Sequence, residues 1–341
     1  MIYRSKAPLR IGLAGGGTDV SPYCDMYGGA ILNATISLYA YASIEPLHTP
    51  EIIIEAADRN ETVVMPNTDY LPIDDGQLIL AKGVYNHIVN NYGPVPSGFK
   101  LTTYVDAPAG SGLGSSSTLM VAIIGAFAEW LHLPLGEYDI AHKAYEIERT
   151  ELAMAGGKQD QYAATFGGVN FMEFYDNNRV IVNPLRIKQK NLFELENNLL
   201  LYFTSTSRLS STIIEAQSQN VKEKNEKSID AMHQLKDQAF MMKEALLKGD
   251  VDSIGRILDF GFQYKKQTAQ GISNSKMDEL YSAALAAGAT GGKVSGAGGG
   301  GFMMFYCPNN TRYAVTKVLQ EFGGEFRRYR FVEHGLFTWS F

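Results

Sequence analysis

The sequence predicts a two-domain protein of the α+β class. Its 341 residues are too many for one ordinary hydrophobic core and indicate about two domains. Strand-like and helix-like segments follow one another in mixed order, without the regular βα alternation of a parallel sheet. Residues 187–191 form a mostly polar, basic stretch without clear periodicity, and the composition shifts there. We therefore expect a first domain at residues 1–190 and a second at residues 191–341.

The first domain is expected to begin with two long strands, at residues 2–13 and 29–46, which carry recurring apolar residues. Two short apolar runs, at residues 52–55 and 62–65, then predict a hairpin. Apolar residues recur at helical spacing at residues 78–90 and lie on one side of a helix at residues 138–152. The remaining predicted elements are helices at residues 78–90, 119–131, 138–152 and 159–165, and strands at residues 101–105, 169–175 and 180–182.

The second domain is expected to be richer in helix. It begins with a buried strand at residues 199–204, followed by a long, highly charged helical region at residues 210–247 that Gly249 ends. The other predicted elements are helices at residues 252–266, 277–287 and 312–322, and strands at residues 302–306 and 329–333.

The overall composition predicts a soluble globular protein. Hydrophobic residues make up 45% of the chain and charged residues 19%. The net charge of −6 gives no sign of a nucleic-acid or membrane partner. A phosphorylated ligand would therefore need locally placed cations.

The cysteines and the apolar runs point to the cytoplasm. Cys24 and Cys307 are far apart in sequence and offer neither a disulfide framework nor a zinc-site spacing. The N-terminal ten residues lack the apolar segment of a signal peptide. The longest apolar run, at residues 119–131, is too short to span a bilayer.

Three glycine clusters stand out, and the second of them (residues 108–118) is the most informative. It lies between a predicted strand and a predicted helix, and its glycines let backbone amides approach a ligand closely. The unpaired amides and the positive dipole end of the helix favour a phosphate. No lysine follows Gly114, so the loop is not a Walker A motif. A helix capped by serine explains the same residues equally well.

The other two clusters are open to two interpretations each. In the first glycine cluster (residues 13–19), Asp19 is suited to binding paired sugar hydroxyls. The residues alone favour an ordinary turn in which Asp19 caps a helix at residues 20–27. The third glycine cluster (residues 291–302) contains a G-x-G-x-x-G match, but a strand follows it where a dinucleotide site needs a helix. Close packing against another glycine loop is more consistent with its sequence.

Two carboxylates, Glu148 and Asp160, are separated by a glycine bend at residues 156–157. The bend can fold the second carboxylate back toward the first. Phosphoryl transfer uses one carboxylate on Mg²⁺ and another that accepts the proton of the acceptor hydroxyl. Taken by spacing alone, two solvated acids remain the ordinary alternative.

Together these segments resemble the GHMP kinase superfamily, which includes galactokinase, homoserine kinase and mevalonate kinase. The resemblance covers the whole chain and rests on three motifs in order: residues 7–19, residues 108–118 with their Gly-Leu-Gly-Ser-Ser core, and residues 293–302. It implies a ribosomal protein S5 domain 2-like N-terminal domain and a ferredoxin-like C-terminal domain, with ATP between them.

The resemblance also implies a role for each matching residue. Asp160 would be the catalytic base, with Arg10 beside it to stabilise charge. Ser116 and Glu148 would ligate Mg²⁺. The ATP phosphates would lie on Pro108, Gly110, Ser111, Gly112, Leu113, Gly114, Ser115, Ser116 and Ser117. The sugar would lie on Gly16, Gly17, Thr18, Asp19, Lys158, Gly298 and Gly299.

Within the superfamily, residues 13–20 and 156–162 look most like the bacterial D-glycero-D-manno-heptose 7-phosphate kinases. The likeness implies ATP-dependent phosphorylation of the anomeric C1 hydroxyl, giving the 1,7-bisphosphate for GDP-heptose synthesis. Galactokinases carry Glu-His where this chain has Gly16 and Gly17, so this chain leaves more room there. The alternatives are another sugar kinase, such as an L-fucose kinase, and a GHMP-fold sensor that binds sugar and ATP without turnover.

The remaining expectations concern the substrate phosphate and the assembly. The cations expected to hold a phosphate on the sugar are Lys158, Arg149 and Arg208. For Arg208, a solvated position before a capped helix is equally consistent with the sequence. The expected partners are ATP and a small sugar phosphate, and the protein is expected to be a monomer or a homodimer.

Overall fold

The computed structural model describes residues 1–205 and 210–341. An eight-stranded sheet has the order β12-β1-β2-β5-β3-β4, with β6 paired to β2 and β7 paired to β6. All its pairings are antiparallel except that of β3 with β5. Its strands are β1 (Tyr3–Ala14), β2 (Gly29–Pro46), β3 (Glu51–Ala56), β4 (Glu61–Pro66), β5 (Phe99–Val105), β6 (Val169–Phe174), β7 (Val180–Pro184) and β12 (Phe337–Ser340).

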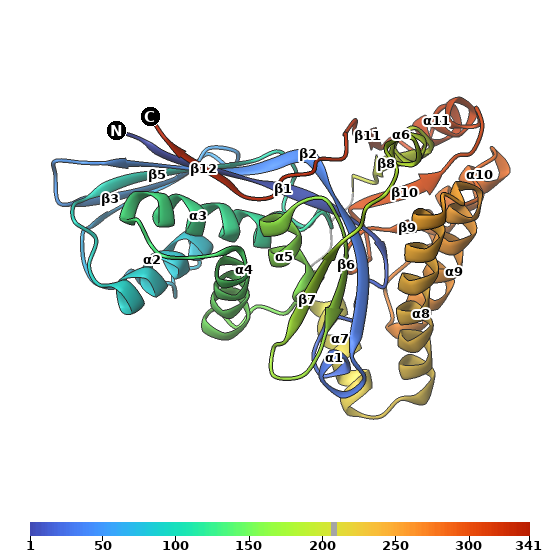
Figure 1. The fold of residues 1–341 in the computed structure, drawn as a ribbon, viewed down its shortest axis with the longest axis horizontal. Coiled ribbons are helices and arrows are strands. Elements are labelled where there is room, and N and C mark those ends of the chain that lie inside the picture. Colours follow the sequence, from blue (N-terminus) through green and yellow to red (C-terminus); the bar gives the residue numbers. More distant parts are fainter. Residues whose placement is uncertain (206–209) are drawn as a thin grey trace.

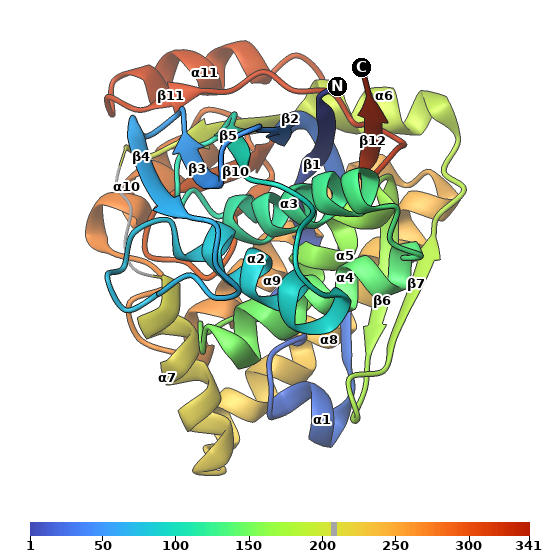
Figure 2. The ribbon, with the colours of Figure 1, turned by 90° about the vertical axis from the view of Figure 1, so that its left-hand side faces the viewer.

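Helices cover one face of this sheet, as Figure 1 and Figure 2 show. They are α2 (Ile79–Tyr92), α3 (Ser115–Leu131), α4 (Glu137–Glu146) and α5 (Gln159–Phe166). The short helix α1 (Tyr23–Tyr27) precedes β2 in the sequence. Helix α3 is apolar on nearly every side because it packs between the sheet and the other helices. Its Phe127 meets Phe99 of β5 and Tyr85 of α2 in the largest core cluster.

A second sheet of four antiparallel strands has the order β11-β8-β10-β9. Its strands are β8 (Leu199–Phe203), β9 (Gly291–Val294), β10 (Phe302–Tyr306) and β11 (Glu325–Phe326). The helices of this part are α6 (Gln189–Asn198), α7 (Ser210–Lys222), α8 (Glu226–Lys248), α9 (Ile254–Thr268), α10 (Ser275–Ala286) and α11 (Arg312–Gln320).

Side-chain alternation along β8 joins the two parts of the molecule. Leu199 and Leu201 belong to a core cluster that also contains Leu9 and Ile11 of β1. Leu200 and its neighbour on the same face belong to a different cluster, formed with α10 and α11. The first of these clusters therefore places β1 beside the second sheet.

The end of the chain returns to the first sheet. Strand β12 pairs with β1, with Tyr3 opposite Ser340, so the two termini lie side by side (Figure 1). The strand expected at residues 329–333 is wrong: Phe331 makes a single bridge to Ile36. Its amide donates to Glu196, so the segment's apolar alternation reflects packing rather than a ladder. The division at residue 190 remains a prediction.

The α+β class is confirmed, and most predicted elements lie where they were expected. The structure adds α6, β9, β11 and β12. It also divides the expected 210–247 helix at residues 223–225, where the Asn225 side chain caps α8. The helix expected at residues 138–152 is α4 followed by a π-helical turn, Ile147–Glu151. Among the described residues, no helix is both long enough and apolar enough to cross a bilayer.

Candidate active site

The second glycine cluster lies against the third, backbone to backbone. Gly112 touches the Ser295 carbonyl so closely that a Cβ would collide with it, and Ser295 Oγ donates to the Gly112 carbonyl at 2.7 Å. The Phe302 amide donates to the Ser111 carbonyl at 2.9 Å. Gly112 also has a φ of 81°, a conformation that glycine adopts without strain. The expectation that the third cluster packs against another glycine loop is confirmed.

In the second cluster, hydrogen bonds close the loop and tie it to β1, while one hydroxyl has no partner among the described residues. The Pro108 carbonyl accepts from the Ser111 amide at 3.2 Å and from Ser115 Oγ at 3.5 Å. Leu113 is fully buried, and its carbonyl accepts from the Arg10 amide of β1 at 3.1 Å. Ser111 Oγ is buried and has no hydrogen-bond partner within the described ranges. That hydroxyl can therefore serve a ligand of this loop.

Helix α3 begins without a side-chain cap, so the capped-helix interpretation of the serines is wrong. Gly114 is the N-cap residue, with a φ of 80°. Two hydroxyls of the first turn bind a distant carboxylate: Ser116 Oγ donates to Glu148 Oε1 at 2.9 Å, and Ser117 Oγ donates to Glu148 Oε2 at 2.6 Å. The first-turn amides of α3 have no acceptor within the helix and remain suited to an anion.

Glu148 lies in the π-helical turn after α4 and is only 1% exposed. Besides the two serines, Gln161 Nε2 contacts its Oε2 at 2.8 Å, and the Arg149 guanidinium lies 3.4 Å from its Oε1. π-Helical turns occur frequently at functional sites. Here the turn points one carboxylate at the start of α3.

The pair of Ser116 and Glu148 fits a magnesium ion. Both supply hard oxygen atoms, and they meet at the first turn of α3. In the part of the chain that the structure describes, no cluster of three or more His, Cys, Asp or Glu side chains could cage a metal. Mg²⁺ characteristically takes one or two protein oxygens and completes its shell with substrate phosphates and water.

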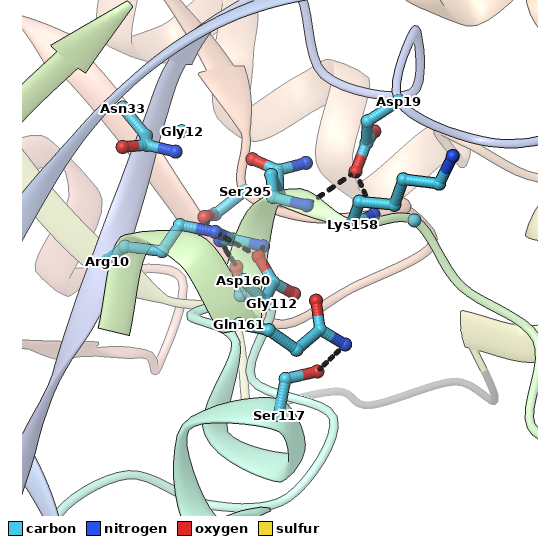
Figure 3. Close-up of polar contacts among 12 residues, drawn as sticks. Arg10, Gly12, Asp19, Asn33, Gly112, Ser117, Lys158, Asp160, Gln161 and Ser295 are labelled. Carbon is cyan, nitrogen blue, oxygen red and sulfur yellow. Dashed lines mark hydrogen bonds and ion pairs between the residues drawn. The ribbon is translucent and has the colours of Figure 1, made fainter. Parts of the chain in front are cut away.

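Arg10 and Asp160 form the centre of the site (Figure 3). Arg10 Nε donates to Asp160 Oδ1 at 2.6 Å, a second guanidinium nitrogen lies 2.5 Å from the same oxygen, and the third donates to the Gly112 carbonyl at 2.6 Å. A Cβ on Gly114 would lie 3.1 Å from the Asp160 carboxyl carbon. One buried guanidinium therefore joins the carboxylate of α5 to the second glycine cluster.

Asp19 caps a helix, but not the one expected at residues 20–27. Its Oδ2 accepts from the Lys158 amide at 2.8 Å and from the Gln159 amide at 3.0 Å, at the start of α5. Helix α1 begins only at Tyr23 and has no side-chain cap. Asp19 Oδ1 is buried and has no partner in residues 1–205 and 210–341. This oxygen remains free to accept a hydroxyl of a ligand.

The neighbouring Thr18 has a structural role in this loop. It is fully buried, and its hydroxyl donates to the Gly15 carbonyl at 2.8 Å and lies 2.9 Å from the Ala30 carbonyl. Gly298 and Gly299 lie against Ile272, since the Gly299 amide donates to the Ile272 carbonyl at 2.8 Å. Thr18, Gly298 and Gly299 therefore stabilise the conformation of their loops.

Two of the three cations expected to hold a substrate phosphate, Lys158 and Arg149, make other contacts. Lys158 is buried, and its ammonium lies 3.8 Å from Asp25 and over the Tyr145 ring, pointing away from Asp160 (Figure 3). Arg149 donates to the Gly157 carbonyl at 3.3 Å and lies beside Glu148. Arg208 is outside the described residues.

Two buried lysines at this site were missed by the sequence reasoning. Lys265 Nζ donates to the Gly16 carbonyl at 3.0 Å, and Lys293 Nζ donates to the Gly12 carbonyl at 2.8 Å. Burial lowers the pKa of Lys265 to about 8, against the opposing charge of Asp19. Burial, with the nearby charges of Lys265 and then Arg10, lowers the pKa of Lys293 to about 7.

The signals for these two lysines differ. Lys293 lies within the third glycine cluster, so its position in a motif was visible in the sequence. Lys265 lies in the last turns of α9, where a lysine normally faces solvent. Its burial depends on which helix face meets the first glycine cluster.

Comparison with known proteins matches both parts of the chain to one family. The family described as "GHMP kinases N terminal domain" matches residues 79–168, and "GHMP kinases C terminal" matches residues 242–325. The chain is 47% identical to the D-glycero-alpha-D-manno-heptose 7-phosphate kinase of Campylobacter jejuni, over 98% of each chain.

Solved structures show the same fold. A D-glycero-D-manno-heptose 1-phosphate kinase from Bacteroides thetaiotaomicron superposes with a TM-score of 0.85 at 46% identity, covering 99% of each chain. Galactokinase of Lactococcus lactis shares the fold alone, with a TM-score of 0.77 at 16% identity, over 98% of this chain and 95% of that one. The predicted GHMP kinase fold is therefore confirmed. With both family domains present in order and a relative 47% identical along almost its whole length, this chain belongs to the GHMP kinases.

Proposed function

We propose that the protein transfers the γ-phosphoryl group of ATP to the anomeric C1 hydroxyl of D-glycero-D-manno-heptose 7-phosphate. The product would be the 1,7-bisphosphate, for GDP-heptose synthesis. The observation that carries the proposal is the Arg10–Asp160 pair, which lies between the phosphate-type loop and the free oxygen of Asp19. The Campylobacter relative supports the choice of sugar.

Asp160 would accept the proton of the C1 hydroxyl. Within the described ranges both guanidinium contacts fall on Oδ1, so Oδ2 is available to the acceptor. Arg10 would stabilise negative charge on the carboxylate and on the transferring group. A base positioned in this way typically contributes about 10²–10⁴-fold in rate.

The ATP phosphates would lie on the second glycine cluster, over the first-turn amides of α3. The unpartnered Ser111 hydroxyl supports this position. Ser116 and Glu148 would hold Mg²⁺, which when bound neutralises charge on the phosphates. The γ-phosphoryl group would then face Arg10, whose guanidinium already contacts the loop through Gly112.

The sugar would lie on the opposite side of Arg10, over the first glycine cluster. Asp19 Oδ1 would accept a sugar hydroxyl, while Oδ2 keeps α5 in place. Gly16 and Gly17 would leave room for a large sugar. A cytoplasmic monomer or homodimer with no nucleic-acid or membrane partner remains our expectation.

The test is a substrate screen with the purified chain, ATP and Mg²⁺. We expect ADP release with D-glycero-D-manno-heptose 7-phosphate, and a new anomeric phosphate in the phosphorus NMR spectrum of the product. Free heptose, mannose and L-fucose should react much more slowly. Preferred turnover of L-fucose would replace the proposal with a fucose kinase. ATP binding without ADP release for every sugar would indicate a sensor.

A further inference from the structure

Two ammonium groups, those of Lys265 and Lys293, are buried beside the first glycine cluster and form no ion pair with another described residue. Lys265 is 5% exposed and Lys293 is 8% exposed. Neither makes an ion pair with any carboxylate in residues 1–205 and 210–341. Each donates to one backbone carbonyl, although an ammonium has three donors. Burying a charge with its donors unfilled is costly, so this arrangement points to an absent anion.

We infer that Lys265 and Lys293 form the subsite for the phosphate group that the acceptor sugar already carries. The inference rests on the proposed function, because it concerns the same sugar site. The ligand chemistry is a phosphomonoester dianion at the end of the sugar remote from the hydroxyl that is phosphorylated.

Two glycines of the first cluster lie next to these ammonium groups. A Cβ on Gly16 would lie 3.8 Å from Lys293 Nζ, and a Cβ on Gly17 would lie 2.9 Å from Lys265 Nζ. Both lysines therefore reach the same loop, one from α9 and one from β9. A side chain at Gly17 would collide with the Lys265 ammonium, so this glycine lets the charge lie directly against the loop.

The lysines lie on the acceptor side of the site. The field of Asp19, the expected ligand of the sugar hydroxyls, acts on Lys265. The charges of Arg10 and Lys265 act on Lys293, so the three cations are close together. Arg10 meets the ATP loop through Gly112, whereas the lysines hold the carbonyls of the first glycine cluster and of β1.

The lowered lysine pKa values agree with this role. Burial, followed by the charges of Lys265 and Arg10, lowers the pKa of Lys293 to about 7, and burial lowers the pKa of Lys265 to about 8. A bound dianion favours the charged form of both lysines and offsets that penalty.

The test combines substitution of each lysine with a comparison of two substrates, one with and one without the phosphate group. Lys265→Met and Lys293→Met keep an unbranched apolar side chain and remove the charge. For each, kcat/KM is measured with heptose 7-phosphate and with free heptose. We expect a loss of roughly 30-fold or more with the phosphorylated sugar, as for truncation of a buried charge pair. The loss with free heptose, and the change in the KM for ATP, should be below about threefold.

The ratio of the two kcat/KM values decides the inference. A ratio that stays at its wild-type value in both variants would overturn it, because the lysines would then be structural. Lys82→Met is a matched control, since Lys82 of α2 is also fully buried but pairs with Asp75, which precedes that helix. Its ratio should equal that of the wild type. Lys293→Arg should retain part of the preference for the phosphorylated sugar if a Met variant does not fold.

Inorganic phosphate distinguishes failure of this inference from failure of the proposed function. If wild type turns over a different sugar, phosphate should still inhibit competitively against that sugar, and the inhibition should weaken at least tenfold in the Met variants. Equal inhibition of wild type and both variants would mean that phosphate binds elsewhere. If phosphate then competes with ATP, its binding site is the ATP loop. That result would overturn the inference whichever sugar is the substrate.

Discussion

Arg10 of β1 and Asp160 of α5 are 150 positions apart in the sequence, yet they are in direct contact, and one carboxylate oxygen of Asp160 receives that whole contact. Two guanidinium nitrogens lie 2.6 Å and 2.5 Å from Asp160 Oδ1, while the third nitrogen holds the Gly112 carbonyl. The carboxylate is fixed in orientation by this contact, and its second oxygen is available for a substrate hydroxyl. Position and charge are thus set before any ligand arrives.

Asp160→Asn tests the base directly. The amide keeps the shape of the carboxylate but cannot take a proton, so we expect kcat to fall by about 10²–10⁴-fold with little change in the KM for sugar. Steady-state kinetics and a thermal melt measure the effect. Asp176→Asn, at an exposed turn, is the control and should behave as wild type. A kcat near the wild-type value for Asp160→Asn would remove the residue from the role of base.

Glu148→Gln tests the magnesium site. The change removes one negative charge at the position where Ser116 and Glu148 meet. We expect the Mg²⁺ concentration for half-maximal activity to rise by about tenfold or more, since ligand charge dominates affinity for this ion. Activity is measured against free Mg²⁺ at saturating sugar. Glu146→Gln, two positions earlier and half-buried, is the control. A higher KM for sugar with an unchanged Mg²⁺ requirement would contradict the assignment.

The sequence was sufficient for elements whose pattern is local. β1, β2 and α3 lie almost where their apolar patterns predict, because those patterns record which face is buried. α6 was missed because only Leu195 is a fully buried leucine in it, and β9 because it begins with two glycines. Both are held by neighbours that are distant in sequence.

The residues of the candidate site also fall into two groups, those that a sequence motif identifies and those that only tertiary packing brings to the site. Motif residues such as Ser116 and Glu148 could be named from the sequence, and the structure brings them into contact. The partners of Asp19 could not be predicted, because the helix it caps begins 140 positions later. Lys265 gives no local signal at all, since only tertiary packing decides whether a helical lysine is buried.

Gly157→Ala should disconnect Asp19 from α5. A Cβ at this position would collide with the Asp19 carboxylate, which then could not accept from the Lys158 and Gln159 amides. We expect a loss of about 1–3 kcal/mol in unfolding free energy, measured by urea denaturation, together with reduced kcat. Gly136→Ala is the control, because its nearest contact would be an ordinary 3.4 Å. Wild-type stability and kcat in Gly157→Ala would show that this contact does not organise the site.

The affinity for the phosphorylated sugar should fall as pH rises. Its phosphate is a dianion above pH 7, whereas Lys293 and Lys265 lose their protons with pKa values of about 7 and about 8. Arg10 and Asp19, the charged groups near the two lysines, do not replace the positive charge that the lysines lose. We expect the KM for heptose 7-phosphate to rise roughly tenfold between pH 7 and pH 9. The KM for free heptose should stay flat, and a parallel rise for both sugars would contradict the explanation.

The same lysines should make the ligand-free protein more stable at alkaline pH. Their pKa values in the folded protein, about 8 for Lys265 and about 7 for Lys293, lie below the ordinary value of 10.5. Between these values the unfolded chain binds more protons, so the contribution of these groups to unfolding free energy rises with pH from about 7 toward 10.5. Urea denaturation at pH 7 and pH 9.5 measures the rise. The double variant Lys265→Met/Lys293→Met should show a smaller rise than wild type, and equal rises would mean that neither ammonium is desolvated in the folded protein.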